Sequence, residues 1–157
     1  MKFVLIDKIE KLITGREITT VKNLTLAEEY LADHFPAFPV LPGVLLLEGL
    51  IESAAWLVRD VHRFAKSMIL LEAARNVRFK SFLSPGMQIR YNVQAKKIDE
   101  NTSSFVGKGV SGDEVIVEAN FSLKHFNLSE KNRSMAQVDA TIVENMKKRW
   151  KLLSSLV

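Results

Sequence analysis

The sequence predicts an α+β domain in which an antiparallel β-sheet wraps round one long central helix. Two observations lead to this prediction. The segment 43–63 is apolar on nearly all sides, which is typical of a helix buried inside a domain. Several runs rich in Val, Ile, Thr and Phe flank it, and turn motifs separate them. A buried helix with a meander of strands is an α+β arrangement.

The amino-terminal stretches 3–14 and 17–24 predict a pair of strands, because β-branched residues recur in both with partial alternation. A glycine-containing turn separates the two stretches. Thr25 and Glu28 then have the spacing of a helix capping box, in which the two residues cap the first turn reciprocally. A short helix is therefore expected at 25–32.

A proline-rich segment leads into the apolar helix. Three of the four prolines of the chain are Pro36, Pro39 and Pro42. Proline fixes its own φ and disfavours the α region for the residue before it, so this segment is expected to be extended and stiff. Pro42 and Gly43 then start the helix, which the apolar pattern continues to about Arg63.

Four strand-like runs follow the helix, and residues typical of turns lie between them. In the last run the side chains alternate, with Val117 and Phe121 on one face and Glu118 and Asn120 on the other. This alternation is typical of a sheet with one buried face. The four predicted strands are 68–80, 87–98, 103–110 and 115–126.

A polar linker at 127–134 and an amphipathic helix at 135–153 complete the chain. The apolar side chains of this helix recur at spacings of three and four, and basic residues lie near its end. Two uses are open: packing on its own domain or a neighbouring subunit, or contact with a membrane surface or carrier protein. The chain is accordingly divided into a domain at 1–126 and an extension at 127–157.

The composition is that of an ordinary globular domain, with 157 residues, 47% of them hydrophobic and 25% charged. The absence of cysteine excludes disulfides, thiol nucleophiles and cysteine-ligated metals, and three histidines argue against a histidine-rich metal site. The net charge of +4 favours acidic partners, but the scattered basic residues argue against nucleic acid. Neither a signal peptide nor a transmembrane segment is evident, so a cytoplasmic location is expected.

His34 and Glu48 have the best chemical case in the chain. An imidazole titrates near neutral pH, so His34, beside a stiff loop, can take or give a proton. Glu48 lies in an apolar helix, where desolvation is expected to raise its pKa and favour the neutral acid. One base and one acid suit proton abstraction coupled to protonation of a leaving group. The N–H groups of Gly43 and Val44, at the helix start, could hold a developing negative charge on a carbonyl oxygen.

Each of these residues also has a structural interpretation. A histidine before a Phe-Pro pair commonly serves as a hydrogen-bonding loop residue, which would be the role of His34. Glu48 has the stronger functional case, because burial of a carboxyl group is costly. Glu52, one turn later on the same face, could be a second site group, an ion-pair partner or a dimer contact. His62 and His125 are expected to be surface residues or hydrogen-bonded structural residues.

The segment from His34 to Glu48 resembles the signature of the β-hydroxyacyl-acyl carrier protein dehydratases. Two further segments, around Asp7 and at 76–80, resemble that family's opening segment and third strand, so the resemblance spans about residues 3–125. It implies the hot-dog fold, in which antiparallel strands wrap a long helix. The matching positions of the signature are His34-Phe35-Pro36, Pro39-Val40, Pro42-Gly43-Val44-Leu45 and Glu48.

The resemblance implies dehydration of a (3R)-3-hydroxyacyl-acyl carrier protein thioester to the trans-2-enoyl thioester in fatty acid or related lipid biosynthesis. His34 would act on the C2 proton, and Glu48 would assist departure of the C3 hydroxyl as water. The N–H of Gly43 would polarise the thioester carbonyl, and Val44 and Glu52 are further substrate-binding candidates. No metal or organic cofactor is implied, since the substrate is carried on the phosphopantetheine of acyl carrier protein.

The resemblance also implies partners. In this family the histidine and glutamate of one site come from different subunits, so a homodimer is the smallest active unit, and trimers of dimers are common among relatives. Carrier proteins of this class are acidic, so four cationic residues are candidates for docking, with a solvated face as the alternative. These residues are Arg75, Arg78, Lys80 and Arg90.

Three positions depart from the family's usual pattern, and one of them is Met87, which replaces the acidic residue that often follows the Pro-Gly turn. Ala37 stands where glycine is usual, and Glu52 stands where glutamine is usual, so a second carboxylate could raise the pKa of Glu48 by repulsion. Two other functions stay open: a hot-dog thioesterase that directs water at the thioester carbonyl, and a catalytically silent binding subunit. The proline-rich segment and its acid match the dehydratases better than either.

Overall fold

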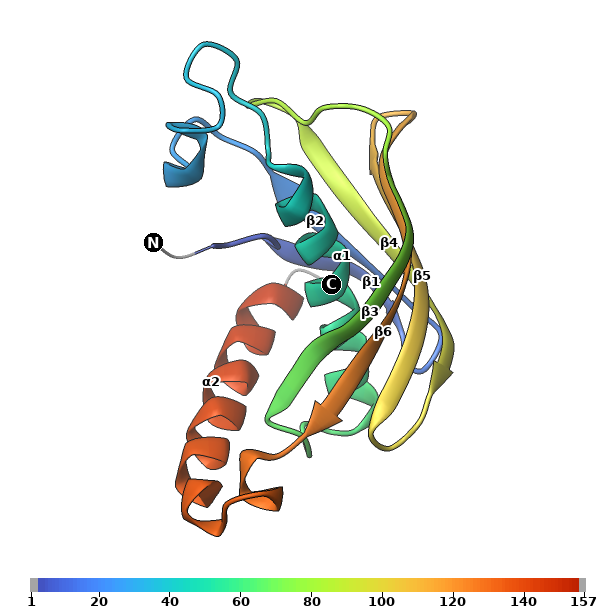
Figure 1. Ribbon diagram of the computed structural model, residues 1–157, viewed down its shortest axis with the longest axis vertical. Helices are drawn as coiled ribbons and strands as arrows, with labels where there is room; N and C mark the ends of the chain where they lie inside the picture. The colour runs from blue at the N-terminus through green and yellow to red at the C-terminus, as the bar shows by residue number, and fades with distance from the viewer. Residues whose placement is uncertain (1–2, 156–157) are drawn as a thin grey trace.

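The computed structural model describes residues 3–155 and shows a curved antiparallel sheet wrapped round a long helix (Figure 1). The sheet has six strands in the order β1-β2-β4-β5-β6-β3, and each neighbouring pair is antiparallel. The predicted α+β class with a hot-dog arrangement is confirmed. The strands are β1 (Lys8–Ile13), β2 (Glu17–Asn23), β3 (Met68–Phe79), β4 (Gln88–Ile98), β5 (Thr102–Ser111) and β6 (Glu114–Phe126).

The amino-terminal strand pair is confirmed, although its first strand begins at Lys8 and not at residue 3. The helix predicted at 25–32 is wrong, because this segment forms one 3₁₀ turn at Glu29–Leu31. The capping box does not form, since the carboxylate of Glu28 pairs with the ammonium group of Lys22 on β2. A tertiary ion pair thus replaces the local contact that the spacing suggested.

Helix α1 (Gly43–Val61) fills the concave face of the sheet, as the apolar pattern predicts. Its side chains Leu50, Trp56 and Leu57 are buried, and so are the inward-facing side chains of the strands that surround it. Complete burial of one such side chain contributes about 1.5–3 kcal/mol, so several of them together stabilise this contact strongly. It also fixes the position of every residue along α1 relative to the sheet.

Helix α2 (Ala136–Ser154) covers the side of α1 that faces away from the sheet (Figure 1). The ring of Trp150 lies 5.8 Å from that of Trp56 on α1 and 5.8 Å from that of Phe64, measured between centroids. Leu153 is buried in the core. The predicted tail helix is confirmed, and it packs against its own domain.

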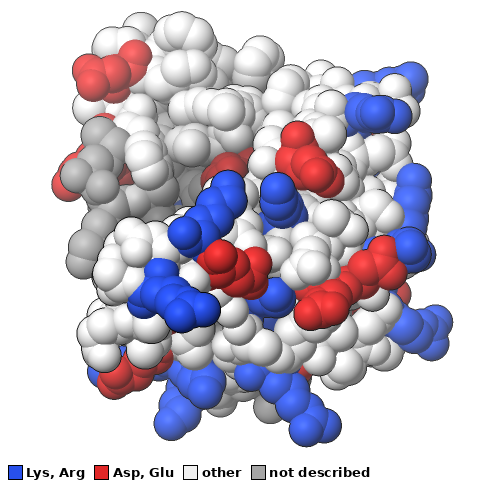
Figure 2. Space-filling view, turned by 60° about the horizontal axis from the view of Figure 1, so that its bottom comes forward, with Lys and Arg blue, Asp and Glu red and all other residues white. Residues whose placement is uncertain are grey.

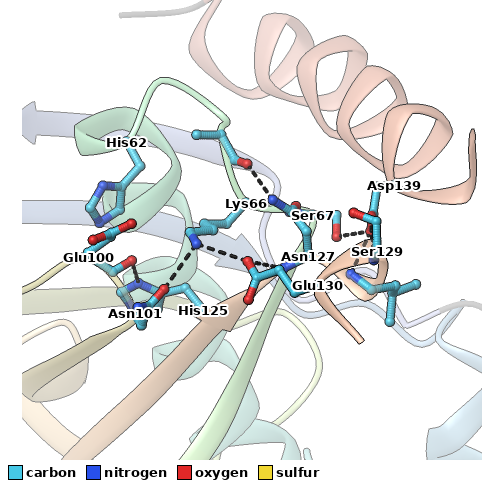
Figure 3. Close-up of polar contacts among 12 residues, drawn as sticks. His62, Lys66, Ser67, Glu100, Asn101, His125, Asn127, Ser129, Glu130 and Asp139 are labelled. Carbon is cyan, nitrogen blue, oxygen red and sulfur yellow. Dashed lines mark hydrogen bonds and ion pairs between the residues drawn. The ribbon is translucent and has the colours of Figure 1, made fainter. Parts of the chain in front are cut away.

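A polar network holds the start of α2 against the end of the sheet (Figure 3). The carboxylate of Asp139 accepts hydrogen bonds from the hydroxyl of Ser67 and from the N–H groups of Leu128 and Ser129, the latter two at 2.9 Å. Burial raises the pKa of Asp139, but the hydrogen bonds outweigh it and hold this pKa well below its usual range. The charged carboxylate therefore fastens the start of the helix.

The predicted polar linker contains two 3₁₀ turns, Leu128–Glu130 and Arg133–Met135. Lys66 anchors the first turn, since its ammonium group lies 3.0 Å from the side-chain oxygens of both Asn101 and Glu130 (Figure 3). The segment that connects β6 to α2 therefore has secondary structure and side-chain contacts of its own. Among residues 3–155, no helix is long and apolar enough to cross a membrane.

Candidate active site

His34 lies in the loop before α1 and is half-buried. Its ring stacks on Phe35 with centroids 4.3 Å apart, and its Nδ1 lies 3.3 Å from the carbonyl oxygen of Val40. Because a carbonyl oxygen can only accept, Nδ1 carries the hydrogen in the neutral ring. The lone pair is then on Nε2, which is the arrangement that a general base requires.

The start of α1 supplies backbone donors beside this loop. The N–H groups of Leu45 and Leu46 donate to the carbonyl of Pro42, whereas those of Gly43 and Val44 come before these first donors and have no acceptor within the helix. Their use in holding a carbonyl oxygen stays a prediction. The ring of Phe79 covers Gly43, since a Cβ there would lie 3.2 Å from its Cε1. Gly43 thus lets a β3 side chain close over the helix start.

Glu48 lies on the exposed side of α1, farther from the core than its apolar surroundings in the sequence suggest. Desolvation by the apolar side chains around it nevertheless raises the pKa of Glu48, so the predicted direction is confirmed. A raised pKa increases the fraction of neutral acid at a given pH. This carboxyl group is therefore suited to donating a proton.

Glu48 lines a cavity of about 360 Å³ that is open to solvent and bordered by α1, α2, β3 and the amino-terminal segment. This volume is within the range of small-molecule sites. His34 is not part of its wall, so the single chain does not bring the two proposed catalytic residues into one cavity. The lining residues are apolar (Phe3, Ile51, Ala55, Trp56, Ile69, Met146) and charged (Glu48, Glu52, Arg59, Arg149).

Glu52 forms an ion pair with α2, since its Oε1 lies 3.8 Å from a guanidinium nitrogen of Arg149. Burial raises the pKa of Glu52, the Arg149 cation lowers it and the Glu48 carboxylate raises it. The Trp56 indole N–H also lowers this pKa, although it makes no hydrogen bond of normal geometry in the described part of the chain. Of the three roles considered for Glu52, the structure shows that of ion-pair partner.

Three of the four candidate docking cations are paired with acidic residues. Arg90 holds Glu10 through two hydrogen bonds of 2.8 and 3.3 Å, and Glu118 pairs with Lys80 at 3.1 Å and Arg78 at 3.8 Å. Arg75 instead lines a groove of about 300 Å³ on the sheet. On the face in Figure 2, Lys and Arg side chains are interspersed with Asp and Glu side chains and form no continuous basic patch.

His125 and His62 have structural roles, as expected. His125 is fully buried, with Nε2 2.7 Å from the hydroxyl of Ser103 and Nδ1 3.4 Å from the carbonyl of Glu100. Burial lowers its pKa. The Nε2 of His62 lies 3.0 Å from the carbonyl of Asp99. Within residues 3–155, no group of three or more His, Asp or Glu side chains is arranged to hold a metal ion.

Sequence analysis did not identify Arg149 and Arg59 as residues of the cavity. Arg149 lies three positions after Met146, which also lines the cavity, so helical spacing places both on the same face of α2. That spacing was the available signal. Arg59 lies on α1 with its guanidinium 5.3 Å from the ring of Trp56, and its place near the helix end indicates only a favourable contact with the helix dipole.

Solved structures share the fold at low sequence identity. The dehydratase heterocomplex ApeI:P from Xenorhabdus doucetiae has a TM-score of 0.68 at 17% identity, and the match covers 85% of this chain and 90% of the chain in that structure. The E. coli PaaI protein from the phenylacetic acid degradation operon has a TM-score of 0.58 at 10% identity, with 76% and 79% coverage. These similarities show a hot-dog fold.

Sequence comparison identifies much closer relatives. The chain is 36% identical over 124 residues to the 3-hydroxyacyl-[acyl-carrier-protein] dehydratase FabZ of Desulfotalea psychrophila, covering 74% of this chain and 79% of that protein. It is 35% identical over 120 residues to FabZ of an Acidovorax species, with 74% and 83% coverage. Residues 1–120 match the model of the FabA-like domain. This chain therefore belongs to the FabA-like family.

Proposed function

We propose that this protein is a 3-hydroxyacyl-acyl carrier protein dehydratase, a hydro-lyase that converts a (3R)-3-hydroxyacyl thioester into the trans-2-enoyl thioester and water. The observation that carries the proposal is the position of Glu48. It is a carboxyl group with a raised pKa on the wall of a cavity, in a chain 36% identical to a FabZ dehydratase. We place the reaction in fatty acid or related lipid biosynthesis.

The proposed reaction uses one base and one acid. The Nε2 of His34 removes the proton from C2 of the substrate, and the electrons of that bond form the C2–C3 double bond. The C3–O bond breaks, and Glu48 donates its proton to the hydroxyl, which leaves as water. The N–H of Gly43 holds the thioester oxygen as negative charge develops, with Val44 beside it. A proton returning from histidine to glutamate through water restores the site.

We infer that His34 and Glu48 of one active site belong to different subunits of a homodimer. In the single chain, His34 lies outside the cavity that Glu48 lines. Strand β3 is at the edge of the sheet and exposes Leu70 and Leu71, at 46% and 42%. An exposed apolar edge strand is a surface for pairing with another chain, which supports a second copy there. A trimer of dimers stays a prediction.

The substrate would reach the site on the phosphopantetheine of acyl carrier protein, and the steps above use no metal or organic cofactor. Docking of an acidic carrier protein on basic residues also stays a prediction. Arg75 is its best candidate, since it forms no ion pair among residues 3–155. We place the catalytic residues in the domain at 1–126 and assign a cytoplasmic location to the protein, as the sequence suggests.

The test is incubation of the purified protein with 3-hydroxyacyl-acyl carrier protein thioesters of increasing chain length, followed by mass spectrometry. Enoyl product, identified by loss of water, supports the proposal. Free hydroxy acid instead would identify a thioesterase, and unchanged thioester across the series would identify a silent binding subunit. The His34→Ala variant serves as the control for contaminating dehydratase.

A further inference from the structure

Helix α2 lies beyond the part of the chain that the family model matches, yet it reaches the wall of the proposed active site. The model covers residues 1–120, and α2 begins at Ala136. Two of its side chains, Met146 and Arg149, line the cavity that also holds Glu48. The guanidinium of Arg149 is turned toward Glu52, 3.8 Å away. The extension thus brings a cation to the carboxylates of α1.

Glu48 and Glu52 lie one helical turn apart on the same cavity wall, so their negative charges repel each other. The titratable groups that face Glu52 are Glu48 and Arg59 on α1, Arg149 on α2 and Tyr91 on β4. Tyr91 stays neutral, because burial raises the pKa of its phenol. Burial lowers the pKa of Arg59 to about 10, which leaves it a cation at neutral pH.

Two interacting carboxyl groups titrate as a pair, and over part of the pH range the pair holds one proton. The cation that lies closest to one member decides which carboxyl is ionised. Arg149 forms its ion pair with Glu52, which favours the charge on Glu52 and the proton on Glu48. Desolvation raises the pKa of both carboxyl groups, so the Arg149 ion pair is the contact that distinguishes Glu52 from Glu48.

We propose that Arg149 is a positioning residue of the active site, which holds the negative charge of the pair on Glu52 and leaves the proton on Glu48. This inference rests on the proposed function, in which Glu48 is the acid. It assigns the carboxy-terminal extension a part in the reaction. It also accounts for Glu52, because a glutamine at that position would offer Arg149 no charge to hold.

The expected effect is modest, since both partners are partly exposed and solvent screens their attraction. The side chain of Arg149 is 34% exposed and that of Glu52 is 25% exposed. An ion pair of this kind shifts an equilibrium by roughly two- to fivefold. The fraction of Glu48 that carries the proton, and with it the rate, is expected to change by the same factor.

The direct test is a carboxyl titration of the full-length protein labelled with ¹³C-glutamate, followed by NMR. In Arg149→Gln we expect Glu52 to titrate at higher pH and Glu48 at lower pH than in the wild type. Arg149→Lys keeps the cation and should restore the wild-type order. In a Glu52→Gln background, Arg149→Gln should leave the pKa of Glu48 unchanged, because the Glu52 carboxylate through which Arg149 acts is absent.

The second readout is the pH profile of dehydration. Arg149→Gln should lower kcat by roughly two- to fivefold where the pair holds one proton, with KM unchanged. Lys147→Gln, an exposed charge change on the same helix, should leave the profile unchanged. A Glu48 titration that does not move in folded Arg149→Gln, or that moves equally without Glu52, overturns the inference. Absence of enoyl product from the wild type overturns the proposed function instead, while the NMR titration still tests the coupling.

Discussion

The ring of Tyr91 packs directly against the backbone of Gly49, the residue that follows the proposed catalytic acid. A Cβ built on Gly49 would overlap the Cζ, Oη and Cε2 atoms of this ring. Tyr91 is fully buried on β4, so it cannot move aside freely. The missing side chain therefore allows α1 to approach the sheet closely at the turn that carries Glu48. This contact fixes the position of that turn relative to β4.

Gly49→Ala is expected to destabilise the protein and slow the reaction. Alanine gains up to about 1 kcal/mol in helix propensity, but overpacking costs about 1–3 kcal/mol, so the net change is unfavourable. Relief of the overlap would shift the turn that bears Glu48, which lowers kcat. Thermal unfolding and steady-state kinetics measure the two effects. Tyr91→Phe is the control, since the Tyr91 hydroxyl has no hydrogen-bond partner within residues 3–155 and its removal should be nearly neutral.

The fold could largely be predicted because the spacing of apolar residues within each segment indicates which of its side chains are buried. The apolar surface of α1 and the alternation in β6 each determine an element without reference to the rest of the chain. The helix predicted at 25–32 failed for the opposite reason. Its spacing was correct for a cap, but Lys22 on a neighbouring strand takes the carboxylate of Glu28. Local patterns do not include competing tertiary partners.

The candidate site divides in the same way. His34 and Glu48 lie close together in the chain within a recognisable motif, so their chemistry could be predicted. The ion pair between Glu52 and Arg149 joins helices far apart in sequence, and no local pattern specifies it. The exposure of Glu48 could not be predicted either, because the apolar pattern of a helix does not indicate which side of it no other element covers.

His34→Ala is expected to reduce dehydration by at least about 100-fold, because general base catalysis contributes on the order of 10²–10⁴. The melting temperature should change little, since the imidazole is half-buried in a loop and packs mainly on Phe35. His62→Ala, which removes a histidine outside the cavity, should retain activity. A His34→Ala enzyme that keeps more than a few per cent of kcat would exclude this residue as the base.

Glu48→Gln keeps the shape of the side chain but removes the acid, and kcat is expected to fall by roughly 10²–10⁴-fold. Stability should respond in the opposite direction. A carboxyl group with a raised pKa stabilises the fold below its unfolded pKa, and this contribution is lost as pH rises through the folded value. At mildly alkaline pH the variant should therefore melt at the same temperature as the wild type or higher. A lower melting temperature there would show that the charge is stabilised and not desolvated.

Mixing the His34→Ala and Glu48→Gln variants tests whether a site is shared between subunits. In a mixed dimer, one of the two sites then combines both substitutions and the other has neither. Random exchange makes half the dimers mixed, so about a quarter of the wild-type rate should return. Native mass spectrometry confirms that mixed dimers form. Mixed dimers without activity would place both residues of a site on one chain.

The buried His125 is expected to make the fold sensitive to mild acid. Burial lowers its pKa, and the nearby Lys66 cation acts in the same direction. The stability that it contributes is full above its unfolded pKa of about 6.5 and is lost as pH falls through the lower folded value. Glu48 and Glu52 have raised pKa values, so their contribution to stability changes with pH in the opposite direction. The effect of His125 is therefore isolated by comparing the wild type with a variant that lacks it. His125→Asn should lose less melting temperature than the wild type between about pH 7.5 and pH 5.

Removal of residues 127–157 is expected to lower the melting temperature, because α2 covers part of the core. Truncation would uncover Trp56 and delete the buried Leu153. The point variant Trp150→Ala separates packing from the loss of the whole segment and should cost roughly 1.5–3 kcal/mol for a partly buried aromatic. Leu152→Ala is its control, since that side chain is 74% exposed and its loss should have little effect.

The alternative for α2, contact with a membrane surface, makes a different prediction for the same variants. If the apolar face served a bilayer, Trp150→Ala would leave thermal unfolding unchanged and reduce binding to vesicles that contain anionic lipid. The structure favours packing on the domain and not membrane contact, because the ring of Trp150 lies against those of both Trp56 and Phe64. A lower melting temperature with unchanged vesicle binding would establish that the helix is part of the domain, the arrangement that places Arg149 beside Glu52.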